Sequence, residues 1–147
     1  MKPRNETLNA LKAGAVYFGL VFVAGFVLGT IRTLVISPAL GEVSAVLVEL
    51  PFMLVVSWIA CCWIVNLLLV QKNPIARITM GISALLMLLV AEAMLSIGFA
   101  GLSLQEHFAL YLKLAAQLGL LGQFAFAVFP LIQLKFPTGQ DRFGIMQ

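Results

Sequence analysis

Glu92 is the residue in this sequence whose type and surroundings point most clearly to chemistry. It is a carboxylic acid inside a long apolar stretch, and residues 88–91 and 93–95 beside it offer no charged partner. An ionisable group in such a setting costs free energy unless it is paired or neutralised, so it marks a functional site by default. Three interpretations stay open: a buried ion pair that fixes helix register, a carboxylate that accepts a proton or binds a substrate, and a protonated, hydrogen-bonded side chain.

Two basic residues are candidate partners for this carboxylate. Arg32 directly follows a long apolar run, and its side chain is long enough to reach inward from a membrane interface. Lys113, near the start of the last apolar run, is the second candidate. With one further carboxylate, these residues form the predicted buried polar cluster: Arg32, Glu49, Glu92 and Lys113.

A second predicted group combines acidic residues with a histidine on the same side of the protein: Glu42, Glu106 and His107. Glu42 and Glu49 are seven residues apart, so in a helix they share one face. Their segment is either an interfacial helix or an extension of the following membrane helix with a kink at Pro51. It forms either a solvated acidic face or a carboxylate-lined vestibule that gathers cations.

Residue spacing gives no support for a metal or a cofactor. His107 is the only histidine, and the H-x-x-x-H, H-E-x-x-H and C-x-x-C patterns are missing. Cys61 and Cys62 are adjacent within an apolar run, which favours buried thiols over a disulfide framework. No phosphate-binding glycine motif is present. We therefore predict no metal, no cofactor and no catalytic residue.

The composition determines what kind of element must position these residues. Of the 147 residues, 62% are hydrophobic and 10% are charged, and the mean hydropathy is +1.07. An average soluble domain has about 45–50% apolar and about 25% charged residues. A soluble globule of this size cannot bury so much apolar surface. This excludes a soluble enzyme, a nucleic-acid-binding domain and a disulfide scaffold, and it predicts an integral membrane protein.

Four apolar segments are long enough to cross a bilayer, for which a helix needs about 20 residues. They must be helices, because open strands would leave backbone groups unpaired in lipid. Gly25 and Gly29 form a GxxxG pattern, which we expect to serve packing within the bundle rather than a homodimer face. The expected fold is all-α, an integral membrane four-helix bundle in a single domain 1–147 with spans about 13–31, 51–70, 78–99 and 108–131.

Basic residues predict the orientation in the membrane. Of the nine Lys and Arg residues, only Arg32 and Lys113 fall on the side opposite the termini, so both termini are expected in the cytoplasm. Glu92 then lies about 21 Å from the cytoplasmic edge, at about 1.5 Å per residue over about 14 residues. The candidate polar residues all fall in the outer half of the membrane or beyond it. The inner half is expected to hold only weaker polar groups such as Asn66 and Gln123.

Several stretches of the chain resemble uncharacterised small bacterial integral membrane proteins with four spans. The resemblance covers most of the chain and implies a bacterial inner membrane, but it supplies no activity and no ligand. The stretches are Gly29-Thr30-Ile31-Arg32, residues 38–42, Glu49-Leu50-Pro51, Ser57-Trp58, and Gly122-Gln123-Phe124-Ala125 with the following residues to Pro130.

Three functions follow as hypotheses. The first is a non-enzymatic accessory or structural component of a membrane assembly, with the lipid bilayer and a homo-oligomer or larger membrane complex as partners, and no nucleic acid. The alternative is a small oligomeric proton- or cation-coupled transporter or channel that uses Glu92. The third is a membrane enzyme acting on a lipid or quinone, with Glu42, Glu49 and His107 as acid and base groups.

Overall fold

The computed structural model describes residues 3–136, which form helices and the turns between them, without a strand. Four stretches are long and apolar enough to cross a membrane, which confirms the predicted all-α fold with four membrane-length helices. The first stretch comprises α1, η1 and α2 together. The elements in chain order are α1 (Pro3–Ile31), the π-helical η1 (Arg32–Ile36), α2 (Ser37–Leu40), α3 (Glu42–Leu67), α4 (Pro74–Gly98), α5 (Leu104–Leu110), α6 (Leu114–Ile132) and the 3-10 helix η2 (Gln133–Lys135).

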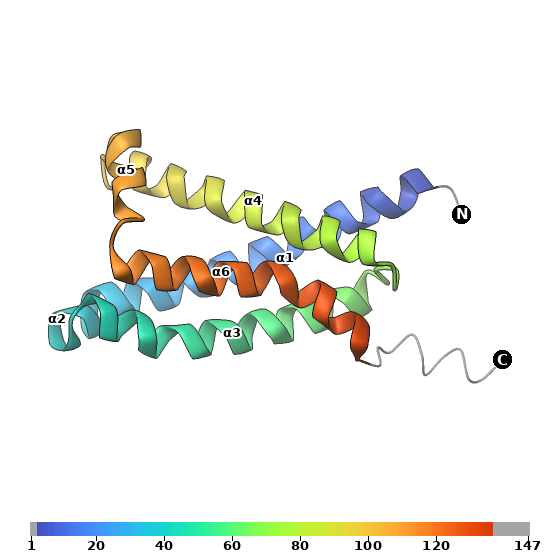
Figure 1. The fold of residues 1–147 in the computed structure, drawn as a ribbon, viewed down its shortest axis with the longest axis horizontal. Coiled ribbons are helices and arrows are strands. Elements are labelled where there is room, and N and C mark those ends of the chain that lie inside the picture. The colour runs from blue at the N-terminus through green and yellow to red at the C-terminus, as the bar shows by residue number, and fades with distance from the viewer. Residues whose placement is uncertain (1–2, 137–147) are drawn as a thin grey trace.

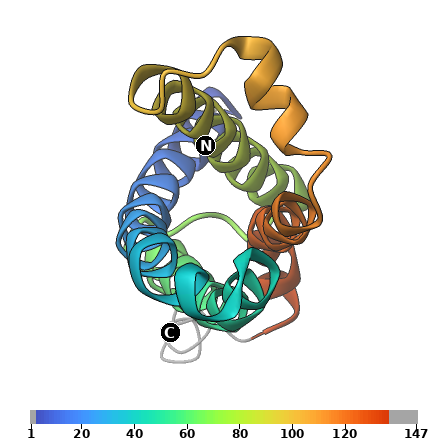
Figure 2. The same ribbon diagram turned by 90° about the vertical axis from the view of Figure 1, so that its left-hand side faces the viewer.

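The four long helices stand in a ring in the order α1, α3, α6 and α4, and each packs mainly on the two beside it (Figures 1 and 2). At one end of the ring α1 begins, α6 ends, and residues 68–73 connect α3 to α4; we call this the turn end. At the other end lie α2 and α5, and we call it the α5 end.

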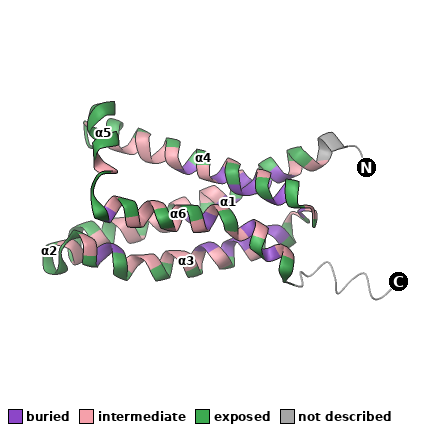
Figure 3. Cartoon of the chain, viewed as in Figure 1, coloured by how far each residue is buried: buried purple, intermediate pink, exposed green. Residues whose placement is uncertain are grey.

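The buried core lies toward the turn end, where most of the fully buried side chains gather (Figure 3). Tyr17 reaches across the ring from α1 and stacks on Phe126 of α6, with ring centroids 4.3 Å apart. Its hydroxyl donates a hydrogen bond to the Phe126 carbonyl over 3.0 Å. This pair therefore joins α1 to α6.

Small residues allow this close packing. A Cβ atom added at Gly14 would lie 2.8 Å from the Met80 carbonyl oxygen, so α1 approaches α4 closely. A Cβ atom at Gly81 would collide with the Ala127 carbonyl oxygen, so α4 approaches α6 closely as well. Glycine has no side chain and commonly permits close contact between helices in membranes, where helices gain little by excluding lipid.

α1 runs obliquely across the ring and changes partners along its length. Beyond its contact with α4 at Gly14, it turns toward α3, where a Cβ atom at Gly25 would lie 3.2 Å from the Met53 side chain. A Cβ atom at Gly29 would lie 3.8 Å from the Glu49 carboxylate. Both glycines of the GxxxG pattern thus serve packing within the bundle, as expected. Because α1 leaves α4, the two helices diverge toward the α5 end (Figures 1 and 2).

Several helix boundaries differ from the expected spans, and the first helical stretch extends beyond both ends of residues 13–31, as far as Leu40. α3 begins at Glu42, so Pro51 lies inside it and residues 42–50 extend the helix. The fourth helix begins at Leu114 rather than at residue 108, because a separate short helix precedes it. That helix, α5, has its own capping box at Ser103 and Glu106, which satisfies its first backbone N–H groups. Residues 111–113 then close α5 with backbone hydrogen bonds to residues three positions earlier.

Arg77 plays a role that the sequence analysis did not foresee, since it was counted there only as a basic residue on the side of the termini. Its side chain is completely buried. The guanidinium donates from Nε to the Gln71 carbonyl and from Nη2 to the Val70 carbonyl, each over 3.0 Å. On the same turn, the Asn9 amide donates to the Leu68 carbonyl over 2.8 Å. Arg77 therefore closes the connection between α3 and α4 from inside the bundle.

Candidate functional site

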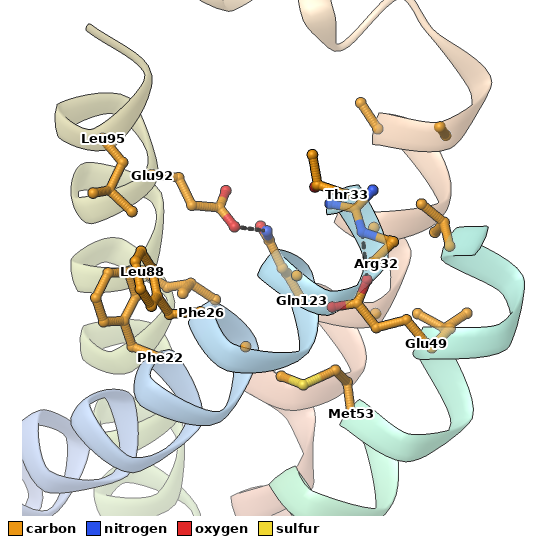
Figure 4. Close-up of a pocket in the computed structure, with 18 of the residues that line it drawn as sticks. Phe22, Phe26, Arg32, Thr33, Glu49, Met53, Leu88, Glu92, Leu95 and Gln123 are labelled. Atoms are coloured by element: carbon orange, nitrogen blue, oxygen red, sulfur yellow. Dashed lines mark hydrogen bonds and ion pairs between the residues drawn. The ribbon is translucent and has the colours of Figure 1, made fainter. Parts of the chain in front are cut away.

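A cavity of about 710 Å³ occupies the α5 end, between the diverging helices (Figure 4). Its walls are mainly apolar and include Phe22, Phe26, Leu88 and Leu95, as the close-up shows. Phe26 and Leu34 both line the cavity and are exposed, so the cavity is open at its rim. Cavities of roughly 300–1,000 Å³ with such walls are the size that holds a small organic molecule.

One ion pair lies in the wall of this cavity. The Arg32 guanidinium contacts the Glu49 carboxylate, with Nε and Oε2 2.6 Å apart (Figure 4). The two side chains are 29% and 15% exposed, so water has limited access to the pair. The sequence analysis favoured Glu92 as the partner of Arg32, and this expectation is wrong. At this level α1 has moved from α4 to α3, and the missing side chain at Gly29 leaves room beside the Glu49 carboxylate.

Glu92 instead pairs with an amide on α6. The Gln123 Nε2 group donates to Glu92 Oε1 over 2.5 Å (Figure 4). Within residues 6–136 this carboxylate makes no ion pair. The Gln123 carbonyl oxygen Oε1 is buried and has no hydrogen-bond partner in the same part of the chain. The pair therefore presents to the cavity an amide oxygen that has no hydrogen-bond partner in the described part of the chain.

Gln123 and Glu92 were expected in opposite halves of the membrane, whereas the structure brings them into contact. A helix starting at residue 108 would carry this residue about 22 Å along its axis, at about 1.5 Å per residue. Because α6 starts at Leu114, the residue lies only about 14 Å from the helix start. Gln123 thereby reaches the level of Glu92, and the signal that would have revealed this was the capping box at Ser103 and Glu106.

His107 and Tyr111 also line the cavity. His107 is buried, and its Nδ1 lies 2.6 Å from the Ser96 hydroxyl on α4, which ties α5 to the end of that helix. The rings of the two residues pack edge to face, with centroids 5.5 Å apart. Burial, and then the negative charge of Glu92, raise the pKa of the Tyr111 phenol above its usual range. This phenol therefore stays neutral and available as a hydrogen-bond donor.

The remaining predicted residues divide between the rim and the outside. Glu42 and Lys113 line the cavity but are exposed, so Lys113 does not belong to a buried cluster. Glu106 lies outside the cavity, where its carboxylate accepts hydrogen bonds of 2.7 Å from the backbone N–H and the hydroxyl of Ser103. These bonds hold the pKa of Glu106 below its usual range.

The predicted outer-face residues are not joined to one another in the structure. Among the described residues there is no group of three or more His, Cys, Asp or Glu side chains that could hold a metal ion. Glu42, Glu49 and His107 all line the cavity. Glu49 is engaged by Arg32 and His107 by Ser96, and no hydrogen bond joins the three to one another in residues 6–136.

Comparisons with protein-family models, with curated proteins and with solved structures give no match to this chain. The resemblance to small bacterial proteins with four spans therefore stays a prediction.

Proposed function

We propose that this protein is a small membrane carrier that binds a proton or a cation at Glu92. The observation that carries the proposal is the set of groups that surround this carboxylate. It faces a largely apolar cavity, and its hydrogen-bond partner is an uncharged amide, whereas the Glu49 carboxylate forms an ion pair with Arg32.

The energetic cost of a charged carboxylate at this position favours reversible binding of a proton or a cation. A partly buried negative charge with apolar neighbours is costly unless a positive charge or a proton neutralises it. No Lys or Arg side chain forms an ion pair with Glu92 in residues 6–136, so a proton or a cation from outside would fill this role. Binding is then favourable yet reversible, which is what a carrier requires.

The packing at the two ends supports a carrier rather than a permanent pore. The cavity lies toward the α5 end, while the turn end is filled by buried side chains such as Tyr17, Ile64 and Met80. A solute bound at Glu92 would reach the other side only if the helices at the turn end move apart. Alternating access of this kind is common in transporters whose binding site lies within the membrane.

The decisive test is the Glu92→Gln variant in liposomes. We expect it to fold normally and to lose proton- or cation-dependent flux, because glutamine keeps the shape of the side chain and removes its charge. Glu106→Gln is the matched control, since Glu106 lies outside the cavity and glutamine can also serve in a capping box. Full activity of folded Glu92→Gln would contradict the proposal.

We also propose a setting for this carrier: the bacterial inner membrane, with both termini in the cytoplasm and the α5 end facing outward. The distribution of basic residues supports this orientation. An accessory role in a larger assembly, the first hypothesis from the sequence, stays a prediction. Purification in mild detergent tests it, because a stoichiometric partner protein would support the accessory role and its absence would favour the carrier.

A further inference from the structure

We propose that the cargo of this cavity is an amphipathic organic ammonium ion that carries N–H groups, with its nitrogen held between Glu92 and Gln123. This inference rests on the proposed function and names the class of its substrate. Three properties of the cavity carry it: the acceptor atoms at its polar site, the balance of charges in its wall, and the apolar surface around them.

The acceptor atoms specify what kind of cation fits. The Glu92 carboxylate receives one hydrogen bond, on Oε1 from Gln123, and its second oxygen has no protein donor in the described part of the chain. The Gln123 carbonyl oxygen is buried and also lacks a partner there. Leaving a buried acceptor unpaired is costly. A primary or secondary ammonium group has at least two N–H donors and can satisfy both oxygens, whereas a quaternary ammonium group has none.

The charges in the cavity wall specify the charge of the cargo. Three carboxylates and two side chains of the Arg or Lys type line the cavity, beside His107. One pair of opposite charges, Arg32 and Glu49, is in direct contact. The formal balance is therefore one negative charge in excess, which a single monovalent cation restores to neutrality. The residues counted are Glu42, Glu49 and Glu92 against Arg32 and Lys113.

The apolar wall specifies the rest of the molecule. The volume of about 710 Å³ is far larger than an inorganic ion needs. Phenylalanine and tyrosine side chains line part of the cavity, and an aromatic face attracts a cation as well as an apolar body. The cargo is thus a molecule with an apolar, ring-sized body attached to its ammonium group. The aromatic residues of the wall are Phe22, Phe26, Tyr111 and Phe126.

The test compares two probes that differ only at the nitrogen: 2-(1-naphthyl)ethylammonium and its N,N,N-trimethyl analogue. Binding of each is measured by naphthalene fluorescence on the full-length protein in phosphatidylcholine nanodiscs, with empty nanodiscs to subtract partition into lipid. We expect saturable binding of the primary ammonium and roughly tenfold or more weaker binding of the trimethyl analogue, because it lacks charge-assisted hydrogen bonds. Equal binding of the two probes would overturn the inference.

Two variants locate the binding. Glu92→Gln and Gln123→Leu should each weaken binding of the primary ammonium by roughly tenfold or more, and should bring it close to that of the trimethyl analogue. Glu106→Gln should bind both probes as the unmodified protein does. Circular dichroism and gel filtration show whether each variant is folded. Unchanged binding by a folded Glu92→Gln variant would refute the site.

The outcomes separate this inference from the proposed function. If neither probe binds, but proton or sodium uptake into liposomes depends on Glu92, the carrier stands and the cargo class is wrong. If the primary ammonium binds at Glu92 without any flux, the cargo class stands and the carrier is wrong. If nanodiscs with and without the protein take up the same amount of probe, the probe binds lipid alone, and the inference is overturned.

Discussion

At the scale of single residues, a double-mutant cycle can measure whether Arg32 interacts with Glu49 or with Glu92. The pair with Glu49 predicts a coupling energy of about 1 kcal/mol in a double-mutant cycle of Arg32→Ala and Glu49→Ala, since the two groups are in contact and partly shielded from water. The cycle of Arg32→Ala with Glu92→Ala should be additive. The measurement is the free energy of unfolding in mixed micelles with increasing sodium dodecyl sulfate. Coupling to Glu92 instead of Glu49 would contradict the structure.

A second prediction at this scale concerns the pH response of α5. The pKa of Glu106 is lowered by hydrogen bonds from the Ser103 backbone and hydroxyl, so its stabilising effect is complete above the unfolded value of about 4.3. The effect is lost as the pH falls through the lower, folded value. The Ser103 amide resonance should therefore titrate with a midpoint below pH about 4.3. The response should vanish in Glu106→Gln; a midpoint at or above the unperturbed value would show that the capping box does not form.

At the scale of helices, two glycine substitutions separate packing from helix propensity. Gly81→Ala places a methyl group against the Ala127 carbonyl, so the contact between α4 and α6 must open. We expect a loss of roughly 1–3 kcal/mol in the free energy of unfolding, the usual cost of overpacking. In Gly19→Ala the new Cβ meets nothing within 4 Å, so it should be neutral or stabilising by up to about 1 kcal/mol. Equal effects in thermal unfolding would show that α4 and α6 are not in close contact.

At the scale of the whole molecule, the orientation in the membrane can be read from reporter fusions. Basic residues concentrate on the side of the termini, which predicts that the C-terminus is cytoplasmic. A green fluorescent protein fused there should fluoresce, and alkaline phosphatase at the same place should be inactive. Fusions placed in the loop of residues 99–103 should behave in the opposite way, because this loop belongs to the α5 end. Active phosphatase at the C-terminus would place the cavity on the cytoplasmic side instead.

The sequence by itself determined the number of membrane-length helices. It also predicted that the candidate polar residues gather toward the end of the protein opposite the termini. Both follow from properties that add along the chain: apolar residues accumulate over about 20 positions, and each charge has a cost that depends on its depth. Glu92 was found as the residue of interest for the same reason. Neither inference required knowledge of which helices are neighbours.

Only the tertiary structure decided which of these residues meet. Arg32 pairs with Glu49 because α1 crosses from α4 to α3. This crossing depends on the positions of the glycines, where helices can come into close contact. Gln123 meets Glu92 because α5 and the turn after it delay the start of α6. The cavity itself exists because α1 and α4 diverge. Contacts between helices depend on crossing angles and axial positions, and these are set jointly by all the packed surfaces rather than by any one segment.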